Sequence, residues 1–363
     1  MIVIGADTHK RTHTCAAVFA GSGEQAGELT APAREKGFGE LLHWARLLEQ
    51  ERIWAIEDCR HVSGSLERFL LASGERVVRV PPRLMGASRR GERRAGKSDP
   101  LDAVAIARAA LREGPETLPA AQLDEGALKM KLLLDHREDL VWARSEDQQR
   151  LRWHLHDLWP EFELRAGCLD RIVWLDRVGR KLARAEQGTR VKIARELVLE
   201  IRRRTRRAAE LEREIAALVK EQASELLELK GCGTLTAAKL IAETAGAKRF
   251  GSDAKFARVA GVAPIPASSG MRTRHRLDRG GNRQLNCALH RIAVIQGRHH
   301  APAREFLARK QAEGKSRREA LRCLKRHLAR RVWQLLIDSE RDRSVNPVDP
   351  ERGPVGVQIA EAT

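Results

Sequence analysis

Tyrosine is absent from this 363-residue chain, and other aromatic residues are scarce, with seven phenylalanines and seven tryptophans. The absence of tyrosine excludes a tyrosine nucleophile, and with it one major class of DNA recombinase. Because aromatic side chains are so few, the composition does not favour the stacking of single-stranded bases on the protein.

Cysteines and long apolar runs are also limited. The six cysteines are widely spaced, with no CxxC pair and no Cys/His metal spacing. This indicates reduced, mostly buried thiols in a cytoplasmic protein. The N-terminus has no basic region followed by a long apolar stretch, and no apolar run is long enough to span a bilayer. We therefore expect neither a signal peptide nor a membrane partner.

Positive charge is in excess. Lysine and arginine number 67 against 49 acidic residues, which gives a formal net charge of +18. The excess favours a polyanionic partner, most commonly nucleic acid, although a solvated arginine-rich surface is the alternative. Two segments, 83–97 and 315–331, concentrate the charge and offer phosphate contacts. The candidate contacts in the first are Arg89, Arg90, Arg93, Arg94 and Lys97.

The order of predicted elements divides the chain. The sequence of residues 1–115 predicts an α/β domain, a mixed sheet with flanking helices. The predicted strands lie near 3–4, 14–20, 53–57 and 76–80, and the predicted helices near 38–51, 64–72 and 100–112. Residues 116–225 predict two long helices in an antiparallel hairpin or coiled coil, broken at Pro160 and Gly167. This segment is a spacer or dimerisation arm, or else part of a plain helical bundle.

Residues 226–342 predict a second, mainly helical domain, and residues 343–363 a disordered polar tail. Residues 226–241 resemble a helix-hairpin-helix, in which Gly231 and Gly233 permit a tight turn before a helix N-terminus that can hold a phosphate. An ordinary connection between helices with a glycine cap explains the same two glycines.

Four acidic residues lie at the ends of predicted core elements. Asp7 and Glu57 each end an apolar strand, and Asp99 and Asp102 share one face at the start of a helix. If these ends converge, their carboxylates form a site for hard divalent cations, most plausibly Mg²⁺. A helix cap and a favourable dipole explain Asp99 and Asp102 without a metal, and Asp58 is an alternative to Glu57.

A serine pair is the candidate nucleophile. Ser268 and Ser269 follow two prolines and precede Gly270, so the backbone around them is restrained on one side and free on the other. Such a hydroxyl can attack a phosphodiester if cations stabilise the developing charge. An ordinary turn before a basic loop is the alternative, which spacing alone favours. The candidate phosphate contacts here are Arg272, Arg274, Arg276 and Arg283.

The ordered set of motifs resembles the transposases of the one-ten family of insertion sequences, the Asp-Glu-Asp-Asp class of RNA-guided recombinases. The resemblance covers about residues 1–113 and 226–300, with a helical linker between them. The matching segments are Gly5–Lys10, Ile56–Glu57, Lys97–Ala103, Gly231–Gly233, Ala260–Pro264, Ser269–Gly270 and Gly280–Arg283.

The resemblance implies an N-terminal RuvC-like domain of RNase H type, a coiled-coil linker and a C-terminal transposase domain. It implies that Asp7, Glu57, Asp99 and Asp102 bind Mg²⁺ and that Ser269, or alternatively Ser268, forms a covalent phosphoserine link to DNA. It also implies a structured guide RNA that pairs with donor and target DNA. The expected assembly is a homodimer or homotetramer associated with the bacterial or archaeal nucleoid.

Overall fold

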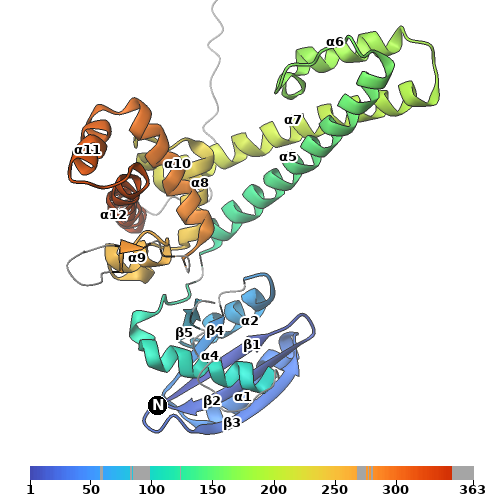
Figure 1. Cartoon of the computed structure of the whole chain (residues 1–363). Coiled ribbons are helices and arrows are strands. Elements are labelled where there is room, and N and C mark those ends of the chain that lie inside the picture. The colour runs from blue at the N-terminus through green and yellow to red at the C-terminus, as the bar shows by residue number, and fades with distance from the viewer. Residues whose placement is uncertain are drawn as a thin grey trace, which may run out of the picture.

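The computed structural model describes residues 1–57, 60–81, 84, 99–122, 124–267, 275–276, 278 and 281–345. A sheet-containing unit lies at one end, a long helical arm projects from the middle, and a helical unit lies beside the base of that arm (Figure 1). The expected order, an α/β N-terminal part followed by a mainly helical part, is confirmed. No helix in these ranges is long and apolar enough to cross a membrane.

The N-terminal sheet has five strands in the order β3-β2-β1-β4-β5. The strands β1 (Ile2–Thr8), β2 (Thr12–Phe19) and β3 (Gln25–Pro32) are antiparallel, whereas β4 (Arg52–Glu57) and β5 (Val77–Val80) run parallel to β1. The sheet is therefore mixed, as predicted. The sequence analysis missed β3 because this edge strand buries only Ala31 and lacks an alternating apolar pattern.

Helices cover both faces of this sheet. The helices α1 (Glu35–Leu48) and α2 (Arg60–Ala72) pack on the face that carries Ile4 and Ile56. The helix α4 (Asp99–Glu113) packs on the opposite face, which carries Val3 and Ala55 (Figure 1). Because successive side chains of a strand point to opposite faces, each buried strand presents apolar residues to both layers.

The contact between α4 and β1 is unusually close because small residues meet there. A Cβ atom added to Gly5 would lie 2.0 Å from the carbonyl oxygen of Ala103 and 2.5 Å from the amide nitrogen of Ala107. Both alanines are fully buried. The missing side chain of Gly5 therefore sets how closely the N-terminal half of α4 approaches the sheet.

The arm is a hairpin of two long antiparallel helices, α5 (Glu125–Leu158) and α7 (Thr189–Ala223) (Figure 1). At its far end, η2 (Cys168–Asp170) and α6 (Ile172–Ala183) fold back on the hairpin, and they bury Leu175 and Leu182 against Leu155 and Val191. The chain connects the two long helices through Pro160 and Gly167, where the sequence analysis placed the break.

Within the described residues, the C-terminal unit is helical apart from one short hairpin. After η3 (Ser224–Leu227), its elements are α8 (Thr234–Thr244), η4 (Lys248–Phe250), α9 (Asp253–Val259), β6 (Ile265–Pro266), β7 (His275–Arg276), α10 (Arg283–His299), α11 (Ala301–Ala312) and α12 (Arg317–Val345). Helix α12 includes residues 343–345, and the rest of the predicted tail lies outside the described residues.

The base of the arm is built into the core of the C-terminal unit. Met130 of α5 and Ile215 of α7 are fully buried in the same apolar cluster as Leu240, Leu289 and Val332 of the C-terminal helices. Burial of this kind contributes about 1.5–3 kcal/mol for each large apolar side chain. The arm and the C-terminal unit therefore form one continuous packed body.

Candidate active site

The ends of β1 and β4 bring Asp7 and Glu57 to the same edge of the sheet. The strands are parallel and Ala6 pairs with Ile56, so Asp7 and Glu57 occupy the next position on each strand. Alternation places both on the face covered by α4, the face that also carries Ala55. Asp58, the alternative to Glu57, lies outside the described residues.

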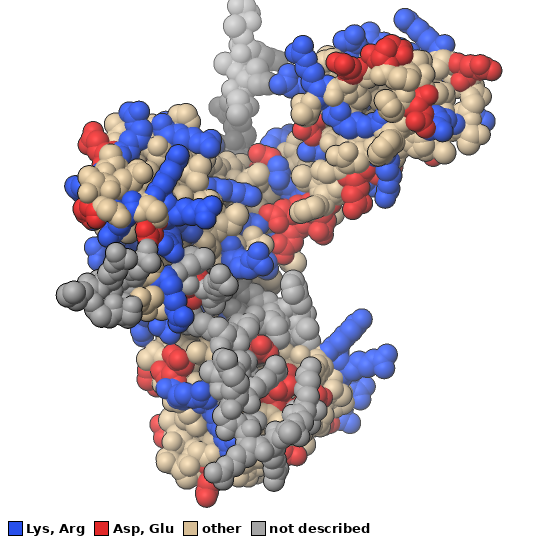
Figure 2. Space-filling model, in the orientation of Figure 1, with Lys and Arg blue, Asp and Glu red and all other residues tan. Residues whose placement is uncertain are grey.

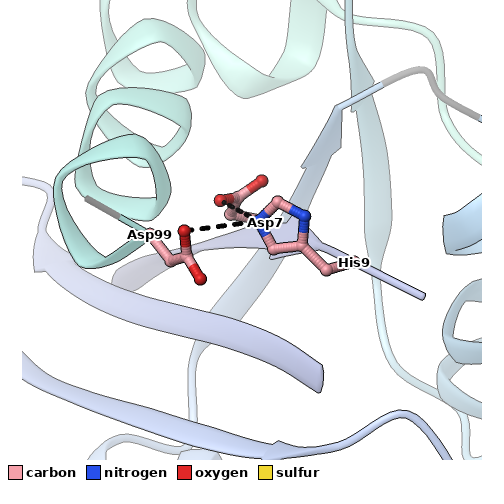
Figure 3. Close-up of side chains that lie close together, drawn as sticks. All are labelled: Asp7, His9 and Asp99. Atoms are coloured by element: carbon pink, nitrogen blue, oxygen red, sulfur yellow. Dashed lines mark hydrogen bonds and ion pairs between the residues drawn. The ribbon is translucent and has the colours of Figure 1, made fainter. Parts of the chain in front are cut away.

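Helix α4 begins at this edge, with Asp99 and Asp102 in its first turn. A bridging histidine connects two of the acidic residues (Figure 3). The Nε2 atom of His9 lies 3.1 Å from Oδ2 of Asp7 and 3.4 Å from Oδ1 of Asp99. One ligand atom from each of these three residues falls within 4.8 Å of the others.

The electrostatics of the cluster suit a cation. Burial raises the pKa of the Asp7 carboxyl, His9 lowers it, and the negative charges of Asp102 and Asp99 raise it further, with a raised pKa as the net result. Asp7 is only 8% exposed, so water screens these charges poorly. Carboxylate oxygens that repel one another in a partly buried site are suitable ligands for a hard divalent ion.

His9 was part of a quoted motif, but the sequence analysis gave it no role. In an extended strand, residues two apart point to the same side. The same spacing could have predicted from the sequence that the side chain of His9 lies beside that of Asp7. An imidazole ligand widens the set of cations that the site can accept beyond Mg²⁺, because nitrogen donors suit transition metals.

The predicted serine pair lies outside the described residues, and so do Arg272 and Arg274. The structure does describe the flanks of this segment. Strands β6 and β7 form a short antiparallel pair in which Ile265 faces Arg276, and Arg283 is the first residue of α10. The segment that carries the serines therefore connects two paired strands.

A polar clamp holds the turn that precedes these strands. The side-chain amide of Asn286 donates hydrogen bonds to the carbonyl oxygens of Ala260 (3.0 Å) and Gly261 (2.8 Å). A Cβ atom on Gly281 would lie 2.2 Å from the amide nitrogen of Gly261. The end of α9 and the start of α10 are thus held in close contact, which fixes the base of the serine segment.

Gly231 and Gly233 lie in the turn between η3 and α8. Gly231 has a φ of +89°, and a Cβ atom there would lie 3.1 Å from the side chain of Ile295 in α10. Gly233 is the N-cap of α8, with open space around it. Close packing accounts for Gly231, while only Gly233 lies where a ligand has room.

Lysine and arginine side chains gather over the visible face of the C-terminal unit, whereas acidic and basic side chains are mixed at the tip of the arm (Figure 2). The five basic residues predicted to lie beside the carboxylates fall outside the described residues. These residues are Arg89, Arg90, Arg93, Arg94 and Lys97.

The described polar contacts between α9 and the sheet unit lie at the far end of α4 from the carboxylates. Arg258 forms an ion pair with Glu113 at 3.9 Å, and Nζ of Lys255 donates to the carbonyl oxygen of Glu116 at 3.1 Å. Helix α4 has 15 residues. At 1.5 Å per residue, its two ends are about 21 Å apart.

Comparison with known proteins agrees with this architecture. A family model for transposases of the DEDD, IS110 type matches residues 4–160, and a second, described as the transposase IS116/IS110/IS902 family, matches residues 223–308. The first match contains the sheet and its carboxylates, and the second contains the C-terminal serine segment. Together they define the class of protein, a transposase that recombines DNA.

The curated relatives are proteins of insertion elements. An uncharacterised IS116 protein of Streptomyces clavuligerus is 27% identical over 96% of this chain and 97% of its own length. An IS900 protein of Mycobacterium paratuberculosis is 25% identical over 79% of this chain and 83% of its own length. An IS110 protein of Streptomyces coelicolor is 28% identical, with 73% and 75% covered. The chain belongs to the IS110 family of insertion-sequence transposases.

Proposed function

We propose that this transposase cuts and rejoins DNA with a divalent metal, most plausibly Mg²⁺, and a serine nucleophile. The observation that carries the proposal is the convergence of Asp7 and Asp99, from β1 and α4, on one nitrogen of His9. The strand order, with three antiparallel strands followed by two parallel ones, supports a RuvC-like domain of RNase H type. The alternative roles of Asp99 and Asp102 as a helix cap explain neither Asp7 nor Glu57.

The metal-binding residues are Asp7, Glu57, Asp99 and Asp102. When bound, the metal would supply Lewis-acid stabilisation of charge on the phosphate oxygens. In the proposed chemistry, the serine Oγ forms a bond to phosphorus as the bond from phosphorus to a deoxyribose oxygen breaks. The serine proton is released and the departing oxygen takes up a proton, so no other reactant is consumed. Nearby arginines, including Arg276 and Arg283, stabilise the added negative charge.

Titration with Mn²⁺, followed by electron paramagnetic resonance, tests the metal site. We expect Asp7→Asn to abolish tight binding, because Asp7 is the most buried ligand of the cluster. Glu24→Gln, at an exposed acidic residue in the turn before β3, is the matched control and leaves binding unchanged. Equal Mn²⁺ affinity in the wild type and Asp7→Asn contradicts the metal site.

A denaturing gel tests the serine. The wild type leaves a covalent protein–DNA adduct, and Ser269→Ala removes it. If Ser268→Ala removes the adduct and Ser269→Ala does not, the nucleophile is Ser268. If both variants retain the adduct, the serine mechanism is wrong. Cleaved DNA with no adduct in the wild type instead favours a RuvC-like nuclease that uses water.

We further propose that a structured RNA guides the reaction and that the protein acts as a homodimer or homotetramer. The separation of about 21 Å along α4 between the carboxylates and the contacts with α9 supports a site shared between chains. Mixing Asp7→Asn with Ser268→Ala/Ser269→Ala should then restore adduct formation. No recovery, with mixed oligomers verified by mass spectrometry, contradicts a shared site. Sequencing of RNA that copurifies with the protein tests the guide.

A further inference from the structure

A cavity of about 510 Å³ opens in the C-terminal unit beside the hairpin β6–β7. Its walls come from the turn after α9, the hairpin, the end of α11 and the start of α12. It has six lysine or arginine residues and three acidic residues in its lining. The basic residues are Arg276, Lys310, Lys315, Arg322, Lys325 and Arg326.

One of these cations is buried. Lys325 is only 6% exposed, and its ammonium group donates a 2.5 Å hydrogen bond to Oδ1 of Asn286. Among the residues that the structure describes, no carboxylate lies within ion-pair distance of Lys325. A buried charge held only by a neutral amide is costly unless an anion joins it. Burial lowers the pKa of Lys325, the neighbouring Cys287 raises it and the charge of Arg322 lowers it, with a lowered pKa as the net result.

Two neighbouring cations of the cavity differ from Lys325 because acidic partners hold them. Lys310 pairs with Glu313 at 2.8 Å, and Arg326 pairs with Asp253 at 3.0 Å. The adjoining segment 268–274 has the sequence Ser-Ser-Gly-Met-Arg-Thr-Arg, which contains no acidic residue. This stretch of sequence therefore adds no carboxylate to the cavity, and a bound anion would neutralise Lys325.

We propose that this cavity binds a backbone phosphate of a DNA strand, with Lys325 as the cation at its base. The cavity volume lies within the range of pockets that enclose a small molecule or a single nucleotide. Contacts between phosphates and cations on a flat protein surface need no such cavity. Arg276 belongs to β7, so the cavity adjoins the segment that carries the candidate serines. Asn286 links the two features, because it accepts from Lys325 and clamps the turn at Gly261.

This inference rests on DNA binding by the transposase and does not depend on the serine being the nucleophile. The test uses the full chain and a short fluorescein-labelled single-stranded oligodeoxynucleotide, whose binding is measured over a range of salt concentrations. Lys325→Met keeps the aliphatic stem and removes the charge. We expect it to weaken binding and to reduce the slope of log affinity against log salt by about 0.7, the value for one phosphate contact on a single strand.

Lys192→Met is the matched control, because Lys192 is an exposed lysine of the arm far along α7 from this cavity. It removes the same charge and should leave the slope unchanged. An unchanged slope for Lys325→Met, or an equal decrease for both variants, overturns the proposal. Repeating the measurement in the Ser268→Ala/Ser269→Ala background distinguishes the phosphate site from the serine mechanism. The effect of Lys325→Met on the salt slope persists there even if the serine mechanism is wrong.

A native cysteine provides a second readout that does not depend on a charge variant. Cys323 lines the cavity and is partly exposed. We expect the oligodeoxynucleotide to slow alkylation of Cys323 by iodoacetamide relative to the protein without DNA, as measured by peptide mass spectrometry. Absence of this protection overturns the proposal. Protection by an oligoribonucleotide but not by DNA overturns the choice of DNA as the ligand.

Discussion

The close crossing of α4 over β1 at Gly5 predicts that a single methyl group disturbs the proposed metal site. In Gly5→Ala, the new Cβ atom would lie 2.0 Å from the carbonyl oxygen of Ala103 and 2.5 Å from the amide nitrogen of Ala107. Both atoms belong to the backbone of a helix, so no side-chain rotation relieves the clash. The helix or the strand has to move.

The size of that movement follows from the distances. Non-bonded heavy atoms prefer a separation of roughly 3.5–4.0 Å, so full relief of the closest contact requires α4 to retreat by about 1.5 Å. Insertion of one extra carbon into a packed core typically costs about 1–3 kcal/mol, and the two backbone contacts place Gly5→Ala at the upper end of that range or above. Because α4 carries Asp99 and Asp102 and β1 carries Asp7, the same movement separates the carboxylates of the proposed metal site.

Urea unfolding and Mn²⁺ titration of the folded variant measure the two effects. We expect a lower urea midpoint and at least tenfold weaker Mn²⁺ binding for Gly5→Ala. Gly39→Ala is the control, because Gly39 lies within α1 and a Cβ atom there meets nothing within 4 Å. That variant should gain about 0.5–1 kcal/mol, since alanine is the better helix former. A Gly5→Ala protein with wild-type stability and Mn²⁺ affinity refutes the reasoning.

Three further predictions concern polar contacts. Burial opposes ionisation of Glu75, but hydrogen bonds from Arg52 and Trp54 lower its pKa below the usual value. Its contribution to stability is therefore present above about pH 4.3 and is lost as the pH falls. Glu75→Gln should flatten the acid side of a plot of urea midpoint against pH. Glu243 is buried and holds Lys131 at 3.0 Å, so Glu243→Ala should cost about 3–5 kcal/mol in thermal or urea unfolding. Asn286→Ala removes the clamp on the turn after α9, and limited proteolysis should then cut near residue 261 faster.

Much of the N-terminal fold was predictable because local sequence patterns identify most of its strands and helices. Apolar runs that end in Asp7 and Glu57 identified two strands, and an acidic pair before an alanine-rich run identified the start of α4. The edge strand β3 was missed because one edge of it is open and only one of its residues, Ala31, is buried. The predicted helices near 38–51 and 100–112 agree with α1 and α4 to within a few residues.

The candidate site was predictable residue by residue but not as a geometry. The carboxylates were selected because a buried acid needs a partner, which is a property of each residue alone. Their convergence depends on Gly5, whose role appears only when α4 crosses the sheet. Lys325 belongs to the basic segment 315–331, and the sequence does not show which of its cations are exposed to solvent and which are buried. Its environment comes from Asn286, 39 residues earlier in the chain.

The relation between the two halves of the proposed site is weakly fixed within one chain. The chain leaves the sheet edge at Ala121, which donates to Val77, and it enters α5 at Glu125, so few residues connect the units. The ion pair between Arg258 and Glu113 is long and partly exposed, and such pairs contribute about 0–1 kcal/mol. By contrast, the arm and the C-terminal unit share a buried core. The sheet unit is therefore the part of the described structure that is held least firmly and is most easily reoriented when DNA binds.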